Sequence, residues 1–278
     1  SINILNQLSH QKKIELIKSI SKKPQIHIVF KKNISLNKLS IKINKSTNSS
    51  GIFIDERNLF EINEFKKGMF WVQDLSSMLP IFLTKNLKKR KVIDMCSAPG
   101  GKTFQLINSG ANVYAVEKNK ERINKLKANI SRLNYNIKIN NIDALDLNEK
   151  EKFNMVVLDA PCSAIGTLRR NPDILFRNKK INLQNMLNLQ KQLLQKADNI
   201  LLNNGILLYI VCSFLREETY MQINNFLKKN KNYTIDKFDA EKQFSSLIDS
   251  NGFINIIPQK FNNFLIDGFF AAKLIKND

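Results

Sequence analysis

The stretch VIDMCSAPGGKT, residues 92–103, decides the fold, because it begins as a short apolar strand and ends where a helix begins. Gly100 and Gly101 allow the backbone to approach a ligand closely, and the N-terminus of the following helix offers unpaired N–H groups. The G-x-x-x-x-G-K-[ST] spacing of a phosphate-binding P-loop is absent, and so is the G-x-G-x-x-G spacing of a dinucleotide site. The stretch favours a loop for another nucleotide-like cofactor, with a simple tight turn as the alternative.

Strands and helices alternate on the C-terminal side of this loop. Short apolar runs predict strands at 92–95, 113–116, 137–140, 155–158 and 206–211. Apolar stripes at helical spacing lie between these runs, most clearly over 123–133 and 183–201. This alternation predicts an α/β protein with a Rossmann-like, doubly wound and mostly parallel sheet. Ligands of such sheets bind at the carboxyl ends of the strands.

The chain divides into two predicted regions. Residues 1–68 read as a small basic α+β region, with helical spacing over 8–20, strand-like alternation over 26–30 and a Ser/Asn-rich loop over 44–51. Residues 69–278 form the α/β domain, and an amphipathic helix over 72–82 introduces it.

Positive charge is concentrated near the N-terminus. The net charge is +20, and residues 1–91 hold 18 Lys and Arg against 6 Asp and Glu, a local balance of +12. Lysines that neutralise phosphates release condensed counterions, so a polyanion such as RNA is the natural partner. The alternative is that Lys, Asn and Ile are abundant throughout and the lysines form an ordinary solvated surface.

The three cysteines, Cys96, Cys162 and Cys212, form neither an even disulfide framework nor a zinc-site spacing. A reducing cytoplasm suits them, and we expect no metal. The chain has no signal-peptide pattern and no apolar run near the ~20 residues that cross a bilayer. We therefore expect a cytoplasmic monomer that is not bound to a membrane.

Acidic residues follow the next two predicted strands. Glu117 comes directly after the second strand, where a carboxylate can accept hydrogen bonds from both ribose hydroxyls of a cofactor. Asp143 follows the third strand, at the position of an adenine edge. Either residue alone is more often a surface carboxylate, but suitable groups at three consecutive strand ends favour a cofactor pocket.

Cysteines follow the last two predicted strands, in Asp159-Ala160-Pro161-Cys162 and in Val211-Cys212-Ser213. Both reach the carboxyl edge of the sheet and can face one substrate. Carbon 5 of cytosine is too weak a nucleophile to attack a sulfonium methyl group. A thiolate that adds to carbon 6 makes the ring an electron-rich enamine that can do so. A second cysteine can assist product release, and Asp159 can bind the N3 and amino edge of the base.

An arginine pair and two histidines are the other residues whose chemistry bears on function. Arg169 and Arg170 are candidates for contacts with RNA phosphates, and a plain surface role is equally plausible for each. His10 and His27 lie far from these motifs in the sequence, and no catalytic role is assigned to them. A cysteine at the end of a buried strand is usually a small core residue, but the surroundings of Cys162 and Cys212 favour chemistry.

On these residues the chain resembles the Sun-type (NOL/NOP/Sun) RNA cytosine-C5 methyltransferases, and among them the bacterial small-subunit rRNA enzymes. The resemblance runs from about Gly68 to Lys276. It rests on GMFWVQDLS (68–76), the loop over 96–103, DAPCSAIGTLRRNPD (159–173), Cys212-Ser213 and DGFFAAKL (267–274). The chain departs from the family at Ile210-Val211, where Ser-Thr often precedes the nucleophile.

The resemblance implies a class I methyltransferase domain that uses S-adenosylmethionine to methylate a cytosine in 16S rRNA. It assigns Cys212 as the nucleophile and Cys162 as the residue that aids product release. The implied cofactor contacts are Cys96, Ser97, Ala98, Pro99, Gly100, Gly101, Lys102, Glu117, Asp143 and Asp159.

Two rival functions stay open. One is a catalytically silent RNA-binding protein that keeps the fold. The other is an amino-group methyltransferase acting on nucleic acid without a covalent step. That second reading predicts Asn/Asp-Pro-Pro-aromatic after the fourth strand, where this chain has Asp-Ala-Pro-Cys over 159–162.

Overall fold

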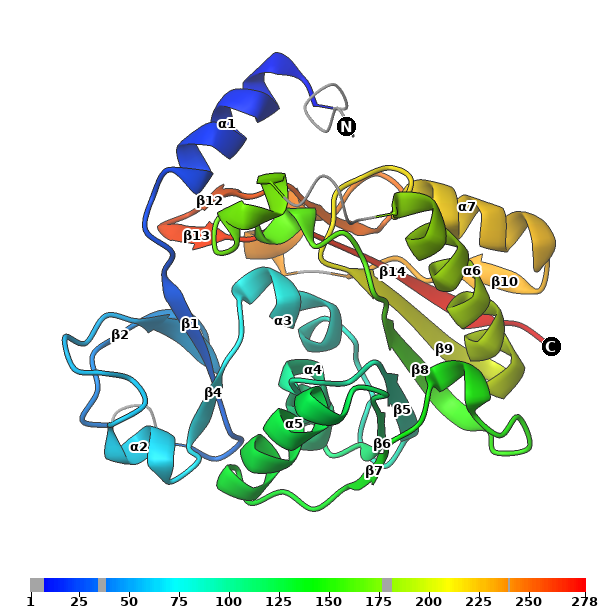
Figure 1. Cartoon of the computed structure of the whole chain (residues 1–278), viewed down its shortest axis with the longest axis horizontal. Coiled ribbons are helices and arrows are strands. Elements are labelled where there is room, and N and C mark those ends of the chain that lie inside the picture. Colours follow the sequence, from blue (N-terminus) through cyan, green and yellow to red (C-terminus); the bar gives the residue numbers. More distant parts are fainter. Residues whose placement is uncertain (1–7, 35–38, 177–181, 240) are drawn as a thin grey trace.

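The computed structural model describes residues 8–34, 39–176, 182–239 and 241–278, and it divides into two sheets with their helices (Figure 1). The N-terminal part contains α1 (His10–Ile20), β1 (Ile26–Phe30), β2 (Ile43–Thr47), β3 (Ser50–Phe53), α2 (Asn63–Lys66) and β4 (Phe70–Val72). Its four strands form an antiparallel sheet in the order β2-β3-β1-β4. This sheet extends to Val72, four residues past the predicted end of the basic region.

The predicted loop over 44–51 is wrong. Residues Ile43–Thr47 and Ser50–Phe53 pair as a hairpin, and hydroxyl contacts of Ser46 and Thr47 with Ser50 close its turn. The polar composition misled the prediction because β2 is an edge strand with no fully buried residue. The buried face of the hairpin comes from β3 instead.

The large sheet belongs to the α/β domain that the sequence predicts. Its strands are β5 (Lys91–Met95), β6 (Asn112–Val116), β7 (Lys138–Asn140), β8 (Phe153–Asp159), β9 (Leu201–Val211), β10 (Tyr233–Ile235), β11 (Ile254–Ile256) and β14 (Phe269–Lys276). The order is β10-β14-β9-β8-β5-β6-β7, and β11 also pairs with β14. Pairs among β5 to β9 are parallel, whereas β14 runs antiparallel to β9. The mostly parallel α/β sheet is therefore confirmed.

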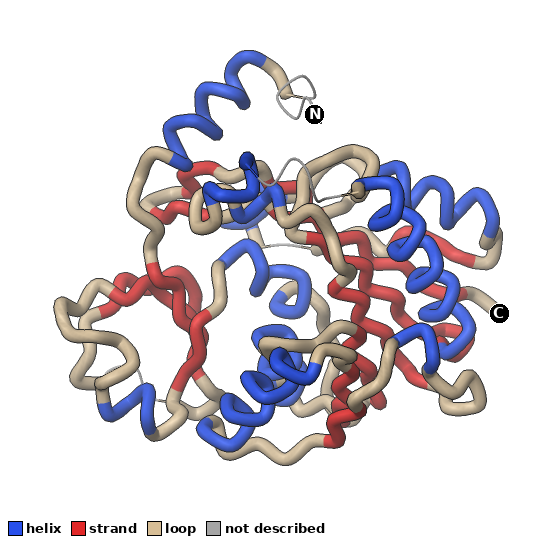
Figure 2. The backbone as a smooth tube through the Cα atoms, in the orientation of Figure 1, coloured by secondary structure: helices blue, strands red, loops and turns tan. Residues whose placement is uncertain are grey.

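Helices cover both faces of this sheet (Figures 1 and 2). The helices are α3 (Leu75–Phe82), α4 (Gly101–Asn108), α5 (Lys120–Arg132), α6 (Leu183–Ile200) and α7 (Tyr220–Lys229). One core joins α3, α4 and α5 to residues such as Val92 and Val157, and the other joins α6 and α7 to Ile93 and Val156. Neighbouring strand residues thus enter opposite cores, as period-2 alternation requires. This two-sided burial makes the strands near-continuous apolar runs.

Short elements complete the chain. They are the 3₁₀ helices η3 (Ala144–Asp146), η4 (Ile165–Thr167), η5 (Pro172–Phe176) and η6 (Lys242–Leu247), and the hairpin β12 (Gln259–Phe261) with β13 (Phe264–Ile266). Helix α1 packs through Leu16 in a small core with Ile165 and Phe214. Both partners lie just after a cysteine-bearing strand end, so the N-terminal helix contacts the loops of the predicted active site.

Candidate active site

The carboxyl ends of β8 and β9 place the two predicted cysteines side by side. The Sγ atoms of Cys162 and Cys212 are 3.2 Å apart. The parallel pairing of these strands, with Asp159 opposite Ile210, sets this closeness. Cys212 lines a cavity of about 240 Å³ together with the backbone loop 97–102 and Asp159. One pocket therefore contains the predicted nucleophile and most of the predicted cofactor loop.

The loop after β5 is shaped by two backbone positions. Gly100 has a φ of 116° and is the residue that precedes α4. A Cβ on Gly100 would come within 2.2 Å of the Phe104 ring, so a larger residue cannot be placed there. Cys96 lies at the other end of the loop with φ 62°, and burial raises the pKa of its thiol to about 12. This shift favours the protonated form of the Cys96 thiol.

Lys102 and Asp159 form an ion pair inside the cavity. Lys102 Nζ lies 2.8 Å from Asp159 Oδ2 and donates a second hydrogen bond to Ser77 Oγ at 3.2 Å. The ammonium also lies 5.0 Å from the centre of the Phe269 ring. The side chain of Lys102 is 9% exposed, so its charge is largely removed from water and held beside the carboxylate of Asp159.

A second, smaller hollow of about 40 Å³ lies on the β6 side of the loop. It is lined by Cys96, Val116, Glu117, Lys118, Arg122, Asp143, Ala144, Pro161, Leu189 and Leu193. Glu117 is 3% exposed and accepts a hydrogen bond from the backbone N–H of Ala98 at 3.3 Å. Arg122 Nη1 lies 3.4 Å from the same carboxylate. The structure thus brings Glu117 and Asp143 together, and it adds Arg122, which sequence reasoning missed.

Arg169 does not lie where the sequence suggested. Its side chain is 0% exposed, and Nη2 lies 3.0 Å from both Asp74 Oδ2 and Asp267 Oδ1. The expectation that Arg169 contacts RNA phosphate is therefore wrong for this structure, because the guanidinium does not reach solvent. Arg170 is different: its side chain is 43% exposed and lines the cysteine cavity, while its Nε donates to Asp267 Oδ2 at 2.6 Å.

The two aspartates that bind Arg169 come from distant parts of the chain. Asp74 precedes α3 and accepts hydrogen bonds from the backbone and hydroxyl of Ser76, and Asp267 precedes β14. Burial and the charge of Asp74 raise the pKa of Asp267 to about 6. Nearby, His27 Nε2 donates to the Leu265 carbonyl at 2.9 Å, and burial lowers the pKa of this imidazole. His27 therefore has a structural contact that joins β1 to β13.

Asp94, inside β5, carries a testable pH dependence. Thr103 Oγ1 donates to its Oδ2 at 2.6 Å, while its Oδ1 is buried with no hydrogen-bond partner. Burial raises the pKa of this carboxyl from 3.8 to about 7. The folded chain therefore binds more protons than the unfolded chain between those pH values. The free energy of unfolding must fall as pH rises through that window, by a few kcal/mol (order of magnitude).

We therefore expect Asp94→Asn to be more stable than wild type at pH 8 and to have a clearly smaller advantage at pH 5. Denaturant unfolding at both pH values measures this. The control is Asp239→Asn, whose carboxylate is 80% exposed and whose removal should change stability by less than about 0.5 kcal/mol. Equal stability of Asp94→Asn and wild type at pH 8 would contradict the assignment.

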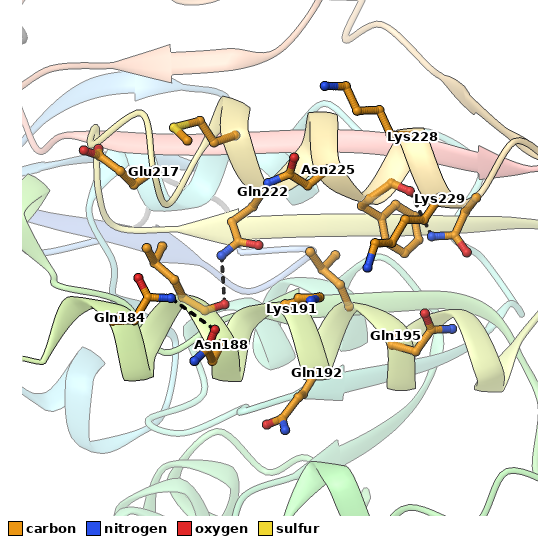
Figure 3. A pocket seen from close by; sticks show the side chains of 15 residues that line it. Gln184, Asn188, Lys191, Gln192, Gln195, Glu217, Gln222, Asn225, Lys228 and Lys229 are labelled. Carbon is orange, nitrogen blue, oxygen red and sulfur yellow. Dashed lines mark hydrogen bonds between the residues drawn. The ribbon is translucent and has the colours of Figure 1, made fainter.

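A third hollow lies between α6 and α7, on the outer side of those helices. Its volume is about 650 Å³, and none of the residues named above lines it. Amide side chains and lysines border it, and Gln222 donates to the Leu187 carbonyl across it (Figure 3). This hollow is separate from the cysteine cavity, where the predicted chemistry lies.

Neither a metal cluster nor a membrane-spanning helix is present in the described ranges. No group of three or more His, Cys, Asp or Glu there has the arrangement of a metal site. No described helix has the length and apolar character needed to cross a bilayer.

Comparisons with known proteins agree with this fold and motif order. A family model described as 16S rRNA methyltransferase RsmB/F matches residues 81–275. The ribosomal RNA small subunit methyltransferase B of Photorhabdus laumondii is 35% identical over 217 residues, which cover 76% of this chain and 48% of the relative. The chain thus spans about half the length of the curated relatives it matches.

Two solved structures share the whole fold. The crystal structure of PH0851 is 25% identical, with a TM-score of 0.87, and the match covers 99% of this chain and 65% of that one. NSun6 from Pyrococcus horikoshii, solved with SFG, is 20% identical with a TM-score of 0.82, and the match covers 99% and 97% of the two chains. These matches include the small N-terminal sheet as well as the large one.

Proposed function

The chain belongs to the 16S rRNA methyltransferase RsmB/F family, and from this premise we propose that it methylates carbon 5 of a cytosine in 16S rRNA. The methyl donor in this proposal is S-adenosylmethionine. The observation that carries the proposal is the pair of cysteine sulfurs 3.2 Å apart at the edge of a cavity shared with the loop 97–102 and Asp159. Covalent addition to a pyrimidine needs one thiol, and the second has a role in release.

The residues present fit the proposed cofactor. Glu117 is a buried carboxylate at the end of β6, where two vicinal ribose hydroxyls can donate to it. Asp143 lies at the edge of the same hollow, and Val116, Leu189 and Leu193 provide apolar walls suited to an adenine ring. Gly100 and Gly101 let the amino-acid part approach the backbone of the loop. When bound, the cofactor supplies an electrophilic methyl group.

The reacting base would occupy the cavity that Cys212 lines. Cys212 forms a bond to carbon 6, and this addition makes carbon 5 nucleophilic. Asp159 accepts a hydrogen bond from the amino group of the ring and favours protonation of N3 as the thiolate adds, and its ion pair with Lys102 fixes the position of its carboxylate. After methylation the carbon 5 proton leaves, the carbon 5–carbon 6 double bond forms again and the bond to Cys212 breaks. Cys162, at 3.2 Å, assists that last step.

RNA binding would use the exposed cations around this cavity and the basic N-terminal region. We propose residues 1–68 as an RNA-binding region and 69–278 as the methyltransferase domain. The local balance of +12 over residues 1–91 supports this role. So does the packing of α1 on the loops that follow Cys162 and Cys212. Of the arginine pair, only Arg170 has the exposure to contact a phosphate.

The proposal is tested by trapping the wild-type chain on 16S rRNA that contains 5-fluorocytosine. The fluorine cannot leave as a proton does, so the enzyme stays bound to the methylated base. We expect a denaturation-resistant protein–RNA adduct that requires S-adenosylmethionine. On ordinary RNA we expect 5-methylcytidine among the digested nucleosides.

Each rival function gives a different result in the same experiment. A silent RNA-binding protein binds cofactor or RNA but forms neither adduct nor methylated nucleoside. An amino-group methyltransferase produces N4-methylcytidine with no adduct. Either result contradicts the proposed reaction.

A further inference from the structure

A buried carboxylate, Glu218, lies beneath the two cysteines and has no part in the chemistry described so far. Glu218 is 0% exposed. Its Oε1 accepts hydrogen bonds from the backbone N–H of Ser163 at 2.8 Å and from Gln190 Nε2 at 3.1 Å. Its Oε2 accepts from Ser163 Oγ at 2.5 Å. Among the described residues it has no ion-pair partner, so the carboxylate is stabilised by neutral donors alone.

These hydrogen bonds fix the loop that carries Cys162 from both sides. Ser163 follows Cys162 directly, and Gln190, which binds Glu218, also donates to the Pro161 carbonyl at 2.8 Å. The peptide groups on either side of Cys162 are therefore held by one carboxylate and one amide. Loss of this support would free the Cys162 loop to move.

Glu218 is also hydrogen-bonded to β9, the strand that directly precedes the proposed nucleophile Cys212. Tyr209, on β9, donates its hydroxyl hydrogen bond to the Glu218 carbonyl at 2.7 Å. Ser213 Oγ, next to Cys212, lies 3.3 Å from Ser163 Oγ. Each cysteine is thus followed by a serine, and the two serines meet above Glu218. This arrangement sets the separation of the two sulfurs.

The surroundings of the two thiols are electrostatically unequal. Cys162 is faced by Cys212, Glu218 and Tyr209, while α6 contributes the neutral Gln190. The hydrogen bond with Cys212, burial, and the negative charges of Cys212 and Glu218 raise the pKa of Cys162 well above its ordinary value, and only the backbone of Ala164 opposes this. Cys212 instead lines the cavity that contains Lys102 and Arg170 together with the carboxylates of Asp74, Asp159 and Asp267, and Lys102 and Arg170 are ion-paired with Asp159 and Asp267.

We infer that Glu218 is a positioning residue that assigns the roles of the two thiols. Its carboxylate holds Cys162 against Cys212 and disfavours negative charge on Cys162. Cys162 stays a neutral thiol, and Cys212 is the sulfur that carries the nucleophilic charge. The consequence for catalysis rests on the proposed methyl transfer, whereas the protonation of Cys162 does not.

A protonated Cys162 explains how it aids release. When the bond between Cys212 and carbon 6 breaks, its electron pair returns to the Cys212 sulfur. The electron pair of the carbon 5–hydrogen bond forms the double bond of the ring, and the proton passes to water. The S–H of Cys162, 3.2 Å away, donates a hydrogen bond to the sulfur as charge builds on it. A Cys162 thiolate would repel that charge instead.

The test is alkylation of the full chain by iodoacetamide at a series of pH values, with each cysteine followed by peptide mass spectrometry. Glu218→Gln removes the charge but keeps an oxygen that accepts from the Ser163 N–H. We expect the pH midpoint for Cys162 to fall. At pH 8 its alkylation rate should rise several-fold, because only the thiolate reacts. Cys96 should be unchanged and serves as the internal reference.

The matched control is Glu217→Gln, the same charge change one residue earlier. Glu217 lines the hollow between α6 and α7, and Figure 3 labels it in the turn just before α7. It should leave the Cys162 profile as in wild type. An unchanged Cys162 profile in folded Glu218→Gln, or an equal shift in Glu217→Gln, overturns the inference.

If Glu218→Gln no longer unfolds cooperatively, a second variant tests the inference. Cys212→Ala removes the hydrogen bond and charge of the partner thiol but keeps burial and Glu218, so Cys162 should react faster than in wild type at pH 8 and still more slowly than a free cysteine. A Cys162 that reacts as fast as a free cysteine there overturns the inference. If the alkylation profile is as expected but no RNA is trapped, the proposed function is rejected and the inference about Glu218 stands.

Discussion

Cys212→Ala should form no adduct with 5-fluorocytosine RNA and should lose methyl transfer by more than about 10³-fold, even though it folds normally. The loss is this large because no described side chain replaces the thiolate at carbon 6, and without that addition carbon 5 does not become nucleophilic. Cys162 does not substitute for it, since burial and the charge of Glu218 still disfavour its thiolate. Denaturing gels of the trapping reaction and counts of transferred methyl groups measure both effects.

Cys162→Ala is the matched control, because it removes the other sulfur of the same pair. It should still attack the base, and adduct should accumulate on unmodified RNA because release is slowed. Thermal melts must show both variants folded. Adduct formation by Cys212→Ala together with its loss in Cys162→Ala would reverse the roles assigned to the two residues.

Arg169→Met should destabilise the chain by about 3–5 kcal/mol and lower its melting temperature by about 10 °C. The reason is that the guanidinium is completely buried between Asp74 and Asp267, which are themselves only 3% and 2% exposed in their side chains. Removing the cation leaves two carboxylates in a region of low polarity, and Arg170 forms an ion pair with only one of them, Asp267. Unfolding by denaturant at pH 8 measures the loss.

The destabilisation should be smaller at pH 5 than at pH 8. Without Arg169 the aspartates can become neutral by binding protons, and the pKa of Asp267 already lies at about 6 in the intact chain. Arg57→Met is the control: its side chain is 50% exposed, its ion pair with Asp55 lies at the surface, and its loss should cost less than about 1 kcal/mol. Equal stability of Arg169→Met and Arg57→Met would contradict a structural role for Arg169.

The parallel part of the fold was predictable because its signal is local. Each central strand is buried on both faces, so Val92–Met95 and Met155–Leu158 had to be apolar runs regardless of their neighbours. The hairpin at Ile43–Phe53 was missed because an edge strand with solvent on one side needs no such run. Strand β14 was recognised only as a motif, since its pairing with β9 joins residues about 60 positions apart.

Site residues that directly follow a strand could be predicted from the sequence. Site residues whose position depends on contacts with distant parts of the chain could not. Strand ends placed Cys162, Cys212 and Asp159 at one edge of the sheet from the sequence alone. The burial of Arg169 was not visible, because its partners lie 95 and 98 positions away and a basic pair resembles a solvated surface. Glu218 was missed for the same reason: its only local signal was its place six residues after Cys212.

The position of β14 has a consequence for biosynthesis. This strand covers β9, and the preceding Asp267 completes the buried cluster with Asp74 and Arg169, while the Leu265 carbonyl binds His27 from the opposite end of the sequence. A chain still emerging from the translating ribosome therefore lacks the final strand beside its nucleophile until residue 276 is made. Nascent chains should stay inactive and sensitive to proteases up to that length, and contacts spanning over 200 residues should make this closure slow.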